Sequence, residues 1–445
     1  MWAKFEVIPL DHEIIFLPSS IEMNCGNSIV VKFGGKSIDA GIQHSDDFEF
    51  KKESSFDNPN IIRLSDKLKE TLLIQESLIY QIKIVESKII IGPIIGLLLG
   101  TQTDRYNPSH MKKYSDRIGI YNKIGGLIYA FSPKFINWKK HTAYGLFYNI
   151  ATSVWEYGLF PLPEVIYRRD FHQDPMIIKK LEQYTGNRLF NSYRFSKYEL
   201  YDFIGLNHEL NRHLPPTELS LWFDQIKKFI DLHTKVILKP IDLSRGRGLC
   251  IIEKVDSVYK VIDYRYRQPI ISMLNDIESF ENFFSENQSF FNKYLIQKYL
   301  PLARIGNSIF DIRVVMQKQK NKVWGCTGIE CRVSKENGYI TNISRGGHAL
   351  TLEESLYRSF KNDYELIPQQ IDDFCQRFCL YMDTMGKNFA EYGIDIAVDI
   401  HKNLWLIEAN VFPSFKGFKT LDRQTYLNIR YTPLLYALSL TQLGE

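Results

Sequence analysis

Two stretches late in the sequence are its most informative part: Gly393-Ile394-Asp395-Ile396-Ala397-Val398-Asp399-Ile400 and Leu404-Trp405-Leu406-Ile407-Glu408-Ala409-Asn410-Val411-Phe412-Pro413. In both, polar and apolar residues alternate in the way that predicts β-strands. If Lys402-Asn403 is the two-residue turn of a hairpin, Asp395 lies opposite Asn410. Glu408 then projects from the same face, because side chains two residues apart in a strand point to one side. The hairpin therefore predicts three oxygen-bearing side chains that meet at one point.

These three side chains, Asp395, Glu408 and Asn410, are candidate ligands of a metal ion. Carboxylate and amide oxygens suit Mg²⁺, which keeps water in its coordination shell and shares that shell with nucleotide phosphates. Asp399 is the rival ligand on the same face, but the same register places it opposite Leu406, so Asp395 is preferred. The simpler interpretation of acidic residues on a hairpin is a solvated face. The pairing geometry is what favours a metal site.

A strand and a loop further upstream carry groups that suit a phosphate. The strand Val236-Ile237-Leu238-Lys239-Pro240 precedes the loop Ser244-Arg245-Gly246-Arg247-Gly248. A lysine ammonium can hold phosphate oxygens, and a glycine-containing loop lets backbone N–H groups come close to them. Taken by themselves, these residues are better explained as a strand that ends in a basic hairpin.

Another strand, Lys293 to Leu300, ends at Pro301, which cannot continue a central strand. The backbone groups near Lys298 and Leu300 could pair with the edge of a purine while apolar side chains cover its faces. As an isolated observation this is only a strand end.

Arginine and amide side chains form the last candidate group. Asp311 and Arg313 share one face of an alternating strand. Arg332 lies in a later strand, and the segment from Asn342 to Gly347 offers amide, hydroxyl and backbone donors. Forked guanidinium groups and preorganised donors are what a transferred phosphoryl group or a tetrahedral oxyanion requires. An arginine beside an aspartate is nevertheless usually just an ion pair.

The composition of the whole chain limits the choice of function. The 445 residues include 44% hydrophobic and 24% charged residues, which is typical of a globular chain with two or three domains. With 55 Lys+Arg against 51 Asp+Glu, the net charge of +4 is too small to argue for nucleic acid or a membrane as a partner. The six cysteines lack Cys-x-x-Cys spacing and the first residues lack a signal-peptide pattern, so reduced thiols and a cytoplasmic location are expected.

Three units are expected along the chain. Residues 1–85 hold short β-branched runs and predict a small β-rich domain, in which Gly35-Lys36-Ser37 imitates a P-loop but is expected to be a turn. Residues 86–190 combine strand-like runs with helical spacing around Leu146 to Trp155, which predicts a small α/β domain. Residues 191–445 hold the candidate site.

The order of these segments resembles the ATP-grasp superfamily, and more narrowly the YheC/YheD family of endospore-forming bacteria, which is described as spore-coat associated. The superfamily resemblance covers about residues 190–445 and rests on Leu238-Lys239-Pro240, Ser244 to Gly248, Gln297-Lys298-Tyr299, Asp311-Ile312-Arg313, Asn342 to Gly347, Asp395 and Glu408-Ala409-Asn410. The resemblance implies an α+β ATP-grasp fold, in which two lobes clamp ATP, preceded by the small α/β domain and the N-terminal β-rich domain.

The resemblance also implies roles for individual residues. ATP would be bound by Lys197, Lys239, Ser244, Arg245, Gly246, Gly248, Gln297, Lys298, Leu300 and Asp311. Phosphoryl and acyl transfer would involve Arg313, Arg332 and Asn342, and Mg²⁺ would be bound by Asp395, Glu408 and Asn410. Phe412 stands where many of these ligases have a second asparagine before the proline.

The implied function is that of an Mg-ATP-dependent carboxylate–amine ligase, which joins a carboxylate to an amine through an acyl phosphate by positioning and charge stabilisation. The sequence does not identify either substrate. Two alternatives stay open. One is a protein that binds ATP without catalysis and has a structural role in the endospore coat, with coat proteins as partners. The other is a sugar or amino-acid kinase, which needs only the first half-reaction.

Overall fold

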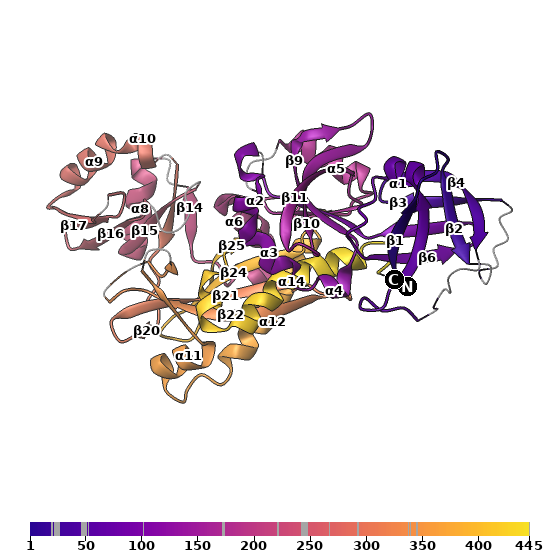
Figure 1. Cartoon of the computed structure of the whole chain (residues 1–445). Helices are drawn as coiled ribbons and strands as arrows, with labels where there is room; N and C mark the ends of the chain where they lie inside the picture. The colour runs from indigo at the N-terminus through magenta and orange to yellow at the C-terminus, as the bar shows by residue number, and fades with distance from the viewer. Residues whose placement is uncertain are drawn as a thin grey trace.

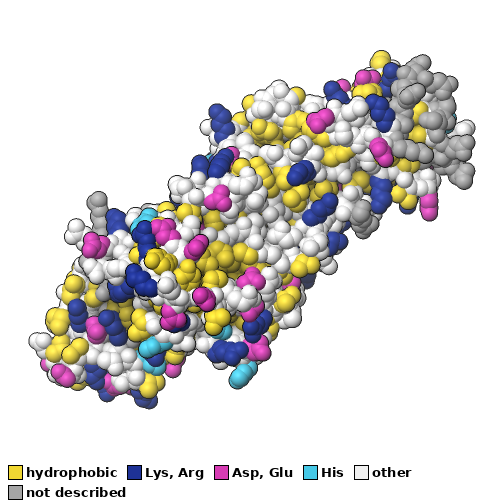
Figure 2. All heavy atoms as spheres, turned by 90° about the horizontal axis from the view of Figure 1, so that it is seen from below, with side chains coloured by type: hydrophobic (Ala, Val, Ile, Leu, Met, Phe, Trp, Pro, Cys, Tyr) yellow, Lys and Arg dark blue, Asp and Glu magenta, His cyan; other side chains and the backbone are white. Residues whose placement is uncertain are grey.

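The computed structural model describes every residue except 19–20, 22–26, 46–50, 52, 101, 171–173, 220–221, 242–247, 267, 292, 337, 339, 344–345 and 445, and at 290 only the backbone. Figure 1 shows an elongated molecule with a β-barrel at one end, a sheet in the middle and two lobes beyond it. On the face seen in Figure 2, basic and acidic side chains are mixed. None of the helices in the described ranges has the length and apolar character that spanning a membrane requires.

The N-terminal unit is a closed barrel. In the order of hydrogen bonding, its strands are β1 (Trp2–Ile8), β5 (Asn60–Ser65), β2 (Ile14–Pro18), β4 (Lys36–Ser45), β3 (Ser28–Phe33), β7 (Lys88–Gly92) and β6 (Tyr80–Val85). Helix α1 (Asp66–Leu72) buries Leu68 and Leu72 in the same core. Because β7 completes the barrel, the barrel continues to Gly92, past the boundary at residue 85.

The Gly-Lys-Ser segment at residues 35–37 lies at a turn, as predicted: Gly34 and Gly35 form the turn, and Lys36 and Ser37 begin β4. Phe33 pairs with Lys36 across the β3–β4 hairpin, and Gly34 has a φ of 58°, in the left-handed region that favours glycine. The ammonium of Lys36 donates to the carbonyl of Thr71 at 2.7 Å. Lys36 therefore stabilises the barrel.

The middle unit is a mixed sheet. Its strands lie in the order β11 (Val154–Pro161), β10 (Thr142–Asn149), β9 (Leu127–Asn137), β8 (Ile94–Leu98), β12 (Val165–Arg168) and β13 (Leu189–Phe190). The parallel pairs β8–β9, β8–β12 and β12–β13 agree with an α/β unit. The helices of this unit are η1 (Thr103–Arg105), α2 (Pro108–Met111), η2 (Lys112–Tyr114), α3 (Ser115–Ile118), α4 (Tyr121–Ile124) and α5 (Pro175–Tyr184). Its apolar residues form one continuous core with those of the barrel.

The helical spacing predicted around Leu146 to Trp155 is wrong. These residues form the end of β10, a turn and the start of β11, with Leu146 opposite Tyr157 and Tyr148 opposite Trp155. Strand β10 is buried on both faces over much of its length, so its sequence does not show the alternation of a half-exposed strand.

The first lobe of the C-terminal half is a sheet in the order β14 (Thr217–Leu219), β19 (Tyr294–Lys298), β15 (Lys235–Pro240), β16 (Cys250–Val255), β17 (Val258–Asp263) and β18 (Ile270–Leu274). Three helices accompany it: α8 (Phe223–His233), α9 (Ile277–Glu286) and α10 (Gln288–Phe291). Apolar residues of the helices and of the sheet form a separate core.

The second lobe is a sheet in the order β23 (His348–Leu350), β22 (Trp324–Val333), β21 (Ser308–Lys318), β24 (Glu391–Val398) and β25 (Leu404–Asn410), with β20 (Arg304–Ile305) paired to β21. Helix α12 (Ile367–Asp383) packs on one face and α14 (Arg423–Ser439) on the other. The remaining helices are α6 (Lys197–Gly205), α7 (His208–Asn211), α11 (Leu352–Phe360) and α13 (Lys416–Leu421). Two mixed lobes of this kind are the α+β architecture predicted for residues 191–445.

Helix α14 connects the second lobe with the middle unit. Its N-terminal half contributes Tyr426 and Ile429 to the core under β21, whereas Leu434 and Ala437 belong to the core shared by the barrel and the middle sheet. The yellow helix in Figure 1 runs accordingly from the lobe towards the middle unit. One helix therefore fixes the lobe that carries the candidate metal ligands to the rest of the molecule.

Candidate functional site

A cavity of about 840 Å³ lies between the two lobes. This volume is within the range of small-molecule sites. Most of the predicted site residues line it: Lys197, Lys239, Gln297, Lys298, Leu300, Asp311, Arg313, Arg332, Asn342, Asp395, Glu408 and Asn410. Gly248 precedes β16 with a φ of 74° and is not part of this lining. Ser244, Arg245 and Gly246 lie outside the described residues.

The β24–β25 hairpin has a different register from the predicted one. Asp395 pairs with Glu408, not with Asn410, and Asn410 pairs with Gly393. The turn is longer than two residues, since the backbone N–H of Asp399 bonds to the carbonyl of Asn403, and a bulge shifts the pairing between Asp395 and Ile396. The predicted pairing is therefore wrong. The three oxygen-bearing side chains nevertheless line one cavity, because directly paired residues share a face.

Asp399 closes the turn of this hairpin. Its carboxylate accepts hydrogen bonds from the indole N–H of Trp405 at 2.9 Å, from the Asn403 amide at 3.0 Å and from the backbone N–H groups of His401 and Asn403 at 2.9 Å each. Burial opposes its charge, but these bonds hold the pKa of Asp399 below its ordinary value. The rival candidate thus has a structural task, and Asp395 is the aspartate that reaches the cavity.

Two arginines and two aspartates form a buried network on the floor of the cavity. Arg313 binds both carboxylate oxygens of Asp395, with 2.9 Å from Nη2 to Oδ2. Arg332 lies 2.8 Å from Asp395 Oδ2 and binds both oxygens of Asp311 at 2.7 Å. The Asp311 carboxylate also accepts a 2.5 Å bond from the hydroxyl of Thr341, next to Asn342. Burial disfavours a charged Asp395, yet the two arginines prevail and its pKa lies below the ordinary value.

Lys239 faces this network from the first lobe. Its ammonium donates to Gln297 Oε1 at 2.5 Å, and the Gln297 amide donates in turn to the hydroxyls of Tyr201 at 2.6 Å and Thr217 at 2.7 Å. Burial and the neighbouring Lys197 lower the pKa of Lys239 to about 8, while Glu408 acts in the opposite direction. Lys197 begins α6 and donates to the carbonyl of Pro240 at 3.1 Å. Two ammonium groups therefore lie where anionic oxygens could bind.

Some of the backbone groups at the strand end predicted to hold a purine already form hydrogen bonds within the protein. The backbone N–H of Lys298 donates to the carbonyl of Pro216, and the carbonyl of Leu300 accepts from Leu302, both at 2.9 Å. Within the described ranges no acceptor is bonded to the N–H of Leu300. That N–H, at the wall of the cavity, is the donor that a purine edge could use.

A family model described as "YheC/D like ATP-grasp" matches residues 186–440, more than half of the chain. The chain belongs to this family. It is also similar to the endospore coat-associated protein YheD of Bacillus subtilis (strain 168), at 25% identity over 421 residues, which covers 90% of this chain and 87% of the relative. Similarity to the endospore coat-associated protein YheC of the same strain is 22% over 294 residues, covering 64% and 80%.

Among solved structures, the fold is similar to that of an ADP complex of N5-carboxyaminoimidazole ribonucleotide synthetase. The TM-score is 0.44 and the identity is 12%, over 74% of this chain and 73% of that chain. The family model and the two relatives confirm the α+β ATP-grasp fold and the YheC/YheD membership expected from the sequence.

The donor set of this ATP-grasp cavity fits Mg-ATP. Glu408 and Asn410 are partly exposed and offer oxygens of the kind that Mg²⁺ prefers. Asp395 differs from them, because both of its oxygens are held by arginines. Among the described residues, no group of three or more His, Cys, Asp or Glu side chains is arranged to hold a metal ion. The proposed site has two carboxylates, and its third oxygen comes from the Asn410 amide. It therefore contains fewer than three side chains of these four types.

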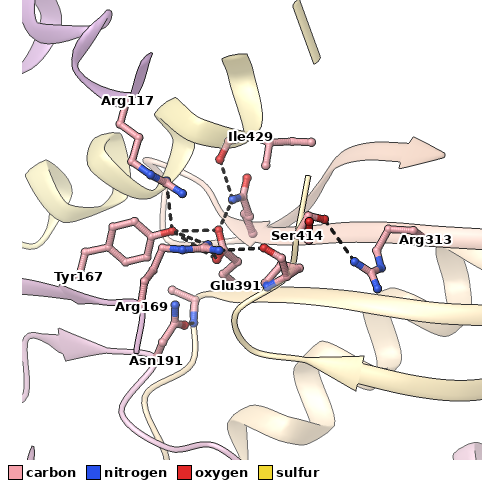
Figure 3. Close-up of polar contacts among 11 residues, drawn as sticks. Arg117, Tyr167, Arg169, Asn191, Arg313, Glu391, Ser414 and Ile429 are labelled. Atoms are coloured by element: carbon pink, nitrogen blue, oxygen red, sulfur yellow. Dashed lines mark hydrogen bonds and ion pairs between the residues drawn. The ribbon is translucent and has the colours of Figure 1, made fainter. Parts of the chain in front are cut away.

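A second buried network, which the sequence analysis missed, joins the middle unit to the site of this ATP-grasp protein (Figure 3). Glu391, fully buried at the start of β24, is paired with Arg169 and accepts bonds from Tyr167 at 3.1 Å and Gln317 at 2.7 Å. Arg169 also donates to the carbonyl of Pro413 at 2.8 Å. On the neighbouring residue, the carbonyl of Ser414 accepts from Arg313 at 3.3 Å.

Glu330 is a further residue that the sequence analysis missed. It is 2% exposed, lines the cavity and pairs with Arg313 across β21 and β22. Burial raises the pKa of Glu330 to about 7, although Arg313 and Arg332 oppose this. The spacing of Glu330-Cys331-Arg332 already placed Glu330 and Arg332 on one strand face, so a signal was present.

Proposed function

We propose that this chain is an Mg-ATP-dependent carboxylate–amine ligase that works through an acyl phosphate. The observation that supports this is the meeting, in one cavity between two ATP-grasp lobes, of lysine ammonium groups, an arginine pair and partly exposed oxygen ligands. The lysines suit phosphate oxygens, the arginines suit a carboxylate or an oxyanion, and Glu408 with Asn410 suits Mg²⁺.

In the first half-reaction, an oxygen of the substrate carboxylate attacks the γ-phosphorus of ATP, the bond to the bridging oxygen breaks, and ADP leaves. Lys239 and Lys197 would hold phosphate oxygens from the first lobe. Bound Mg²⁺, held by Glu408 and Asn410 beside Asp395, would offset the phosphate charge. In-line transfer depends mainly on positioning and charge.

In the second half-reaction, the lone pair of a neutral amine attacks the carbonyl carbon of the acyl phosphate. The carbon–oxygen bond to phosphate then breaks, inorganic phosphate leaves, and the nitrogen loses a proton. Arg313 and Arg332 would face the oxyanion of the tetrahedral intermediate, since Asp395 and Asp311 fix both guanidinium groups in place. Donors that need no reorganisation during the reaction are the most effective ones.

The test is to incubate the purified protein with Mg-ATP, a mixture of free amino acids and cell-wall fragments. A ligase releases ADP and inorganic phosphate in equal amounts and forms a product with the summed mass of two substrates less one water. A phosphorylated product without free phosphate would assign a kinase instead. The Glu408→Gln variant is the control for metal-dependent turnover.

The second candidate function is an ATP-binding but catalytically inactive protein of the endospore coat. The similarity to YheD along 90% of the chain favours it, because that relative is named as coat-associated. This candidate predicts binding of Mg-ATP without ADP release in the same experiment. Attachment to purified coat material, compared between sporulating and growing cells, would test the location.

A further inference from the structure

Glu330 is a buried carboxylate in the cavity that has no part in the mechanism above. One of its oxygens, Oε2, is buried and has no hydrogen-bond partner among the residues that the structure describes. Buried carboxylates normally have donors or a cation beside them, because desolvation of the charge is otherwise uncompensated. A buried, unpartnered oxygen on a residue that lines a cavity therefore indicates a group that a ligand supplies.

The positive charges beside Glu330 are already used. Arg313 pairs with Asp395, and Arg332 pairs with both Asp311 and Asp395. The two guanidinium groups thus balance the two aspartates, and the ionised form of Glu330 adds a further negative charge. Lys416 lines the same cavity, but in the described part of the chain it forms no ion pair with Glu330. The charge balance therefore favours a cationic ligand group.

The position of Glu330 separates it from the phosphate end of the site. Glu330, Arg313, Asp395 and Glu408 are successive partners across β22, β21, β24 and β25. Adjacent strands lie about 4.8 Å apart, so the backbones of Glu330 and Glu408 are about 14 Å apart. Phosphate would lie towards Glu408. Glu330 marks the opposite end of the row, beyond Arg313 and on the same strand as Arg332, where another part of a substrate would lie.

The space around the unpartnered oxygen is narrow. A Cβ at Gly417, in the first turn of α13, would lie 2.0 Å from Glu330 Oε2 and 2.5 Å from Ile343 Cδ1. Glycine at position 417 therefore permits the close approach of this turn. A compact ammonium fits such a place better than a planar guanidinium.

We propose that Glu330 binds the ammonium group of an amino-acid-type substrate. The carboxylate of the same substrate would lie towards Arg313 and Arg332, so one end of the zwitterion would meet the Glu330 carboxylate and the other end guanidinium N–H donors. This inference rests on the proposed ligase function for the view that the cavity holds a substrate, and it names the class of that substrate.

The test is calorimetry on the full chain with Mg²⁺ and a non-hydrolysable ATP analogue. The probes are free amino acids and their N-acetyl derivatives, which keep the carboxylate and lose the ammonium. The wild type should bind at least one free amino acid at least tenfold more tightly than its N-acetyl form. Glu330→Gln should lose most of this preference and bind the ATP analogue with unchanged affinity. The proposal is overturned if the variant keeps the preference, or if no free amino acid is preferred by the wild type.

A second measurement separates ligand binding from a merely structural role. Without ligand, Glu330→Gln should melt at the same temperature as the wild type or higher, because it removes a buried charge that lacks a donor. The matched control, Glu391→Gln, should melt lower, since Glu391 is held by Arg169, Tyr167 and Gln317. An equal drop in both variants would assign Glu330 to the fold. Neither measurement needs turnover, so the amino-acid preference can persist even if the ligase reaction is disproved.

Discussion

Burial and the neighbouring Lys197 disfavour the charged form of Lys239. Its pKa of about 8 in the folded protein lies below the ordinary value of 10.5, chiefly because of burial. Between these two pH values the unfolded chain binds more protons at this residue than the folded chain does. The contribution of Lys239 to stability therefore rises with pH across that window. Phosphate binding, by contrast, requires the protonated, charged form of Lys239.

The affinity for Mg-ATP should therefore fall as the pH rises above about 8. When only the protonated lysine binds, the dissociation constant grows up to about tenfold per pH unit above the pKa of the free protein. Calorimetric titrations from pH 7 to 10 would measure this. Lys239→Arg serves as the control, because an arginine keeps its charge throughout and should flatten the profile. A profile equally steep in both proteins would place the titrating group elsewhere.

A second prediction compares two lysines of different surroundings. Lys239→Ala should weaken Mg-ATP binding at least tenfold, whereas Lys36→Ala should leave it unchanged, since Lys36 bonds to the barrel carbonyl of Thr71. The rise in melting temperature with increasing Mg-ATP measures both effects, because a ligand that binds only the folded state stabilises it. Equal losses in the two variants would make the N-terminal Gly-Lys-Ser segment a nucleotide site again.

At the scale of elements, the β24–β25 hairpin carries two carboxylates with different tasks. Glu408 is proposed to bind the metal ion, whereas Asp399 stabilises the turn. Glu408→Gln should abolish turnover with little change in stability, because Glu408 is partly exposed and an amide has nearly the same volume. ADP release and thermal melting measure the two quantities. Full activity of this variant would remove Glu408 from the proposed metal site.

Asp399→Asn should have the reverse effect. The variant weakens the acceptor for four hydrogen bonds that close the turn, at a cost of about 1–3 kcal/mol in stability. The dependence of turnover on Mg²⁺ should stay as in the wild type. Chemical unfolding and a Mg²⁺ titration of ADP release would check this, and a shifted Mg²⁺ requirement would speak for Asp399 as a ligand.

The sequence predicted the elements of this hairpin better than their register. Alternation reveals strands and their faces, so Asp395, Glu408 and Asn410 were correctly expected in one place. The bulge after Asp395 and the longer turn are set by tertiary contacts that leave no local pattern. Strand β10 was mistaken for a helix, because both of its faces are buried and its sequence does not alternate. The ion pairs between Asp395 and the arginines also depend on tertiary contacts, so the sequence did not predict them.

At the scale of the whole molecule, Arg169 and Glu391 connect units that are far apart in the sequence. Arg169→Met should lower the free energy of unfolding by about 3–5 kcal/mol, because it leaves a fully buried carboxylate without its cation. Arg358→Met is the matched control: its ion pair with Glu354 is exposed and contributes about 0.5 kcal/mol or less. Urea unfolding measures both, and equal effects would show that the buried pair adds nothing.

The arrangement of the units was only partly predictable. Strand and helix patterns indicated a β-rich start and an α/β middle, and the resemblance to ATP-grasp proteins implied an α+β remainder. The contacts between units depend on single side chains, such as Arg169 on Glu391 and Pro413, and no spacing in the sequence announces them. The sequence also does not predict that α14 contributes to the core of the middle unit, because the apolar residues of this helix pack against two different units.

The two-sided packing of α14 sets an order of events during protein synthesis. The barrel has all its strands ahead of the middle sheet and the two lobes in the sequence, so it is translated before them and can close early. The middle sheet follows at once, yet part of its covering, Leu434 and Ala437, is translated only after both lobes. During that interval its apolar surface stays open. The newly made chain is therefore expected to be most prone to aggregation, and to capture by chaperones, between the end of β13 and the emergence of α14.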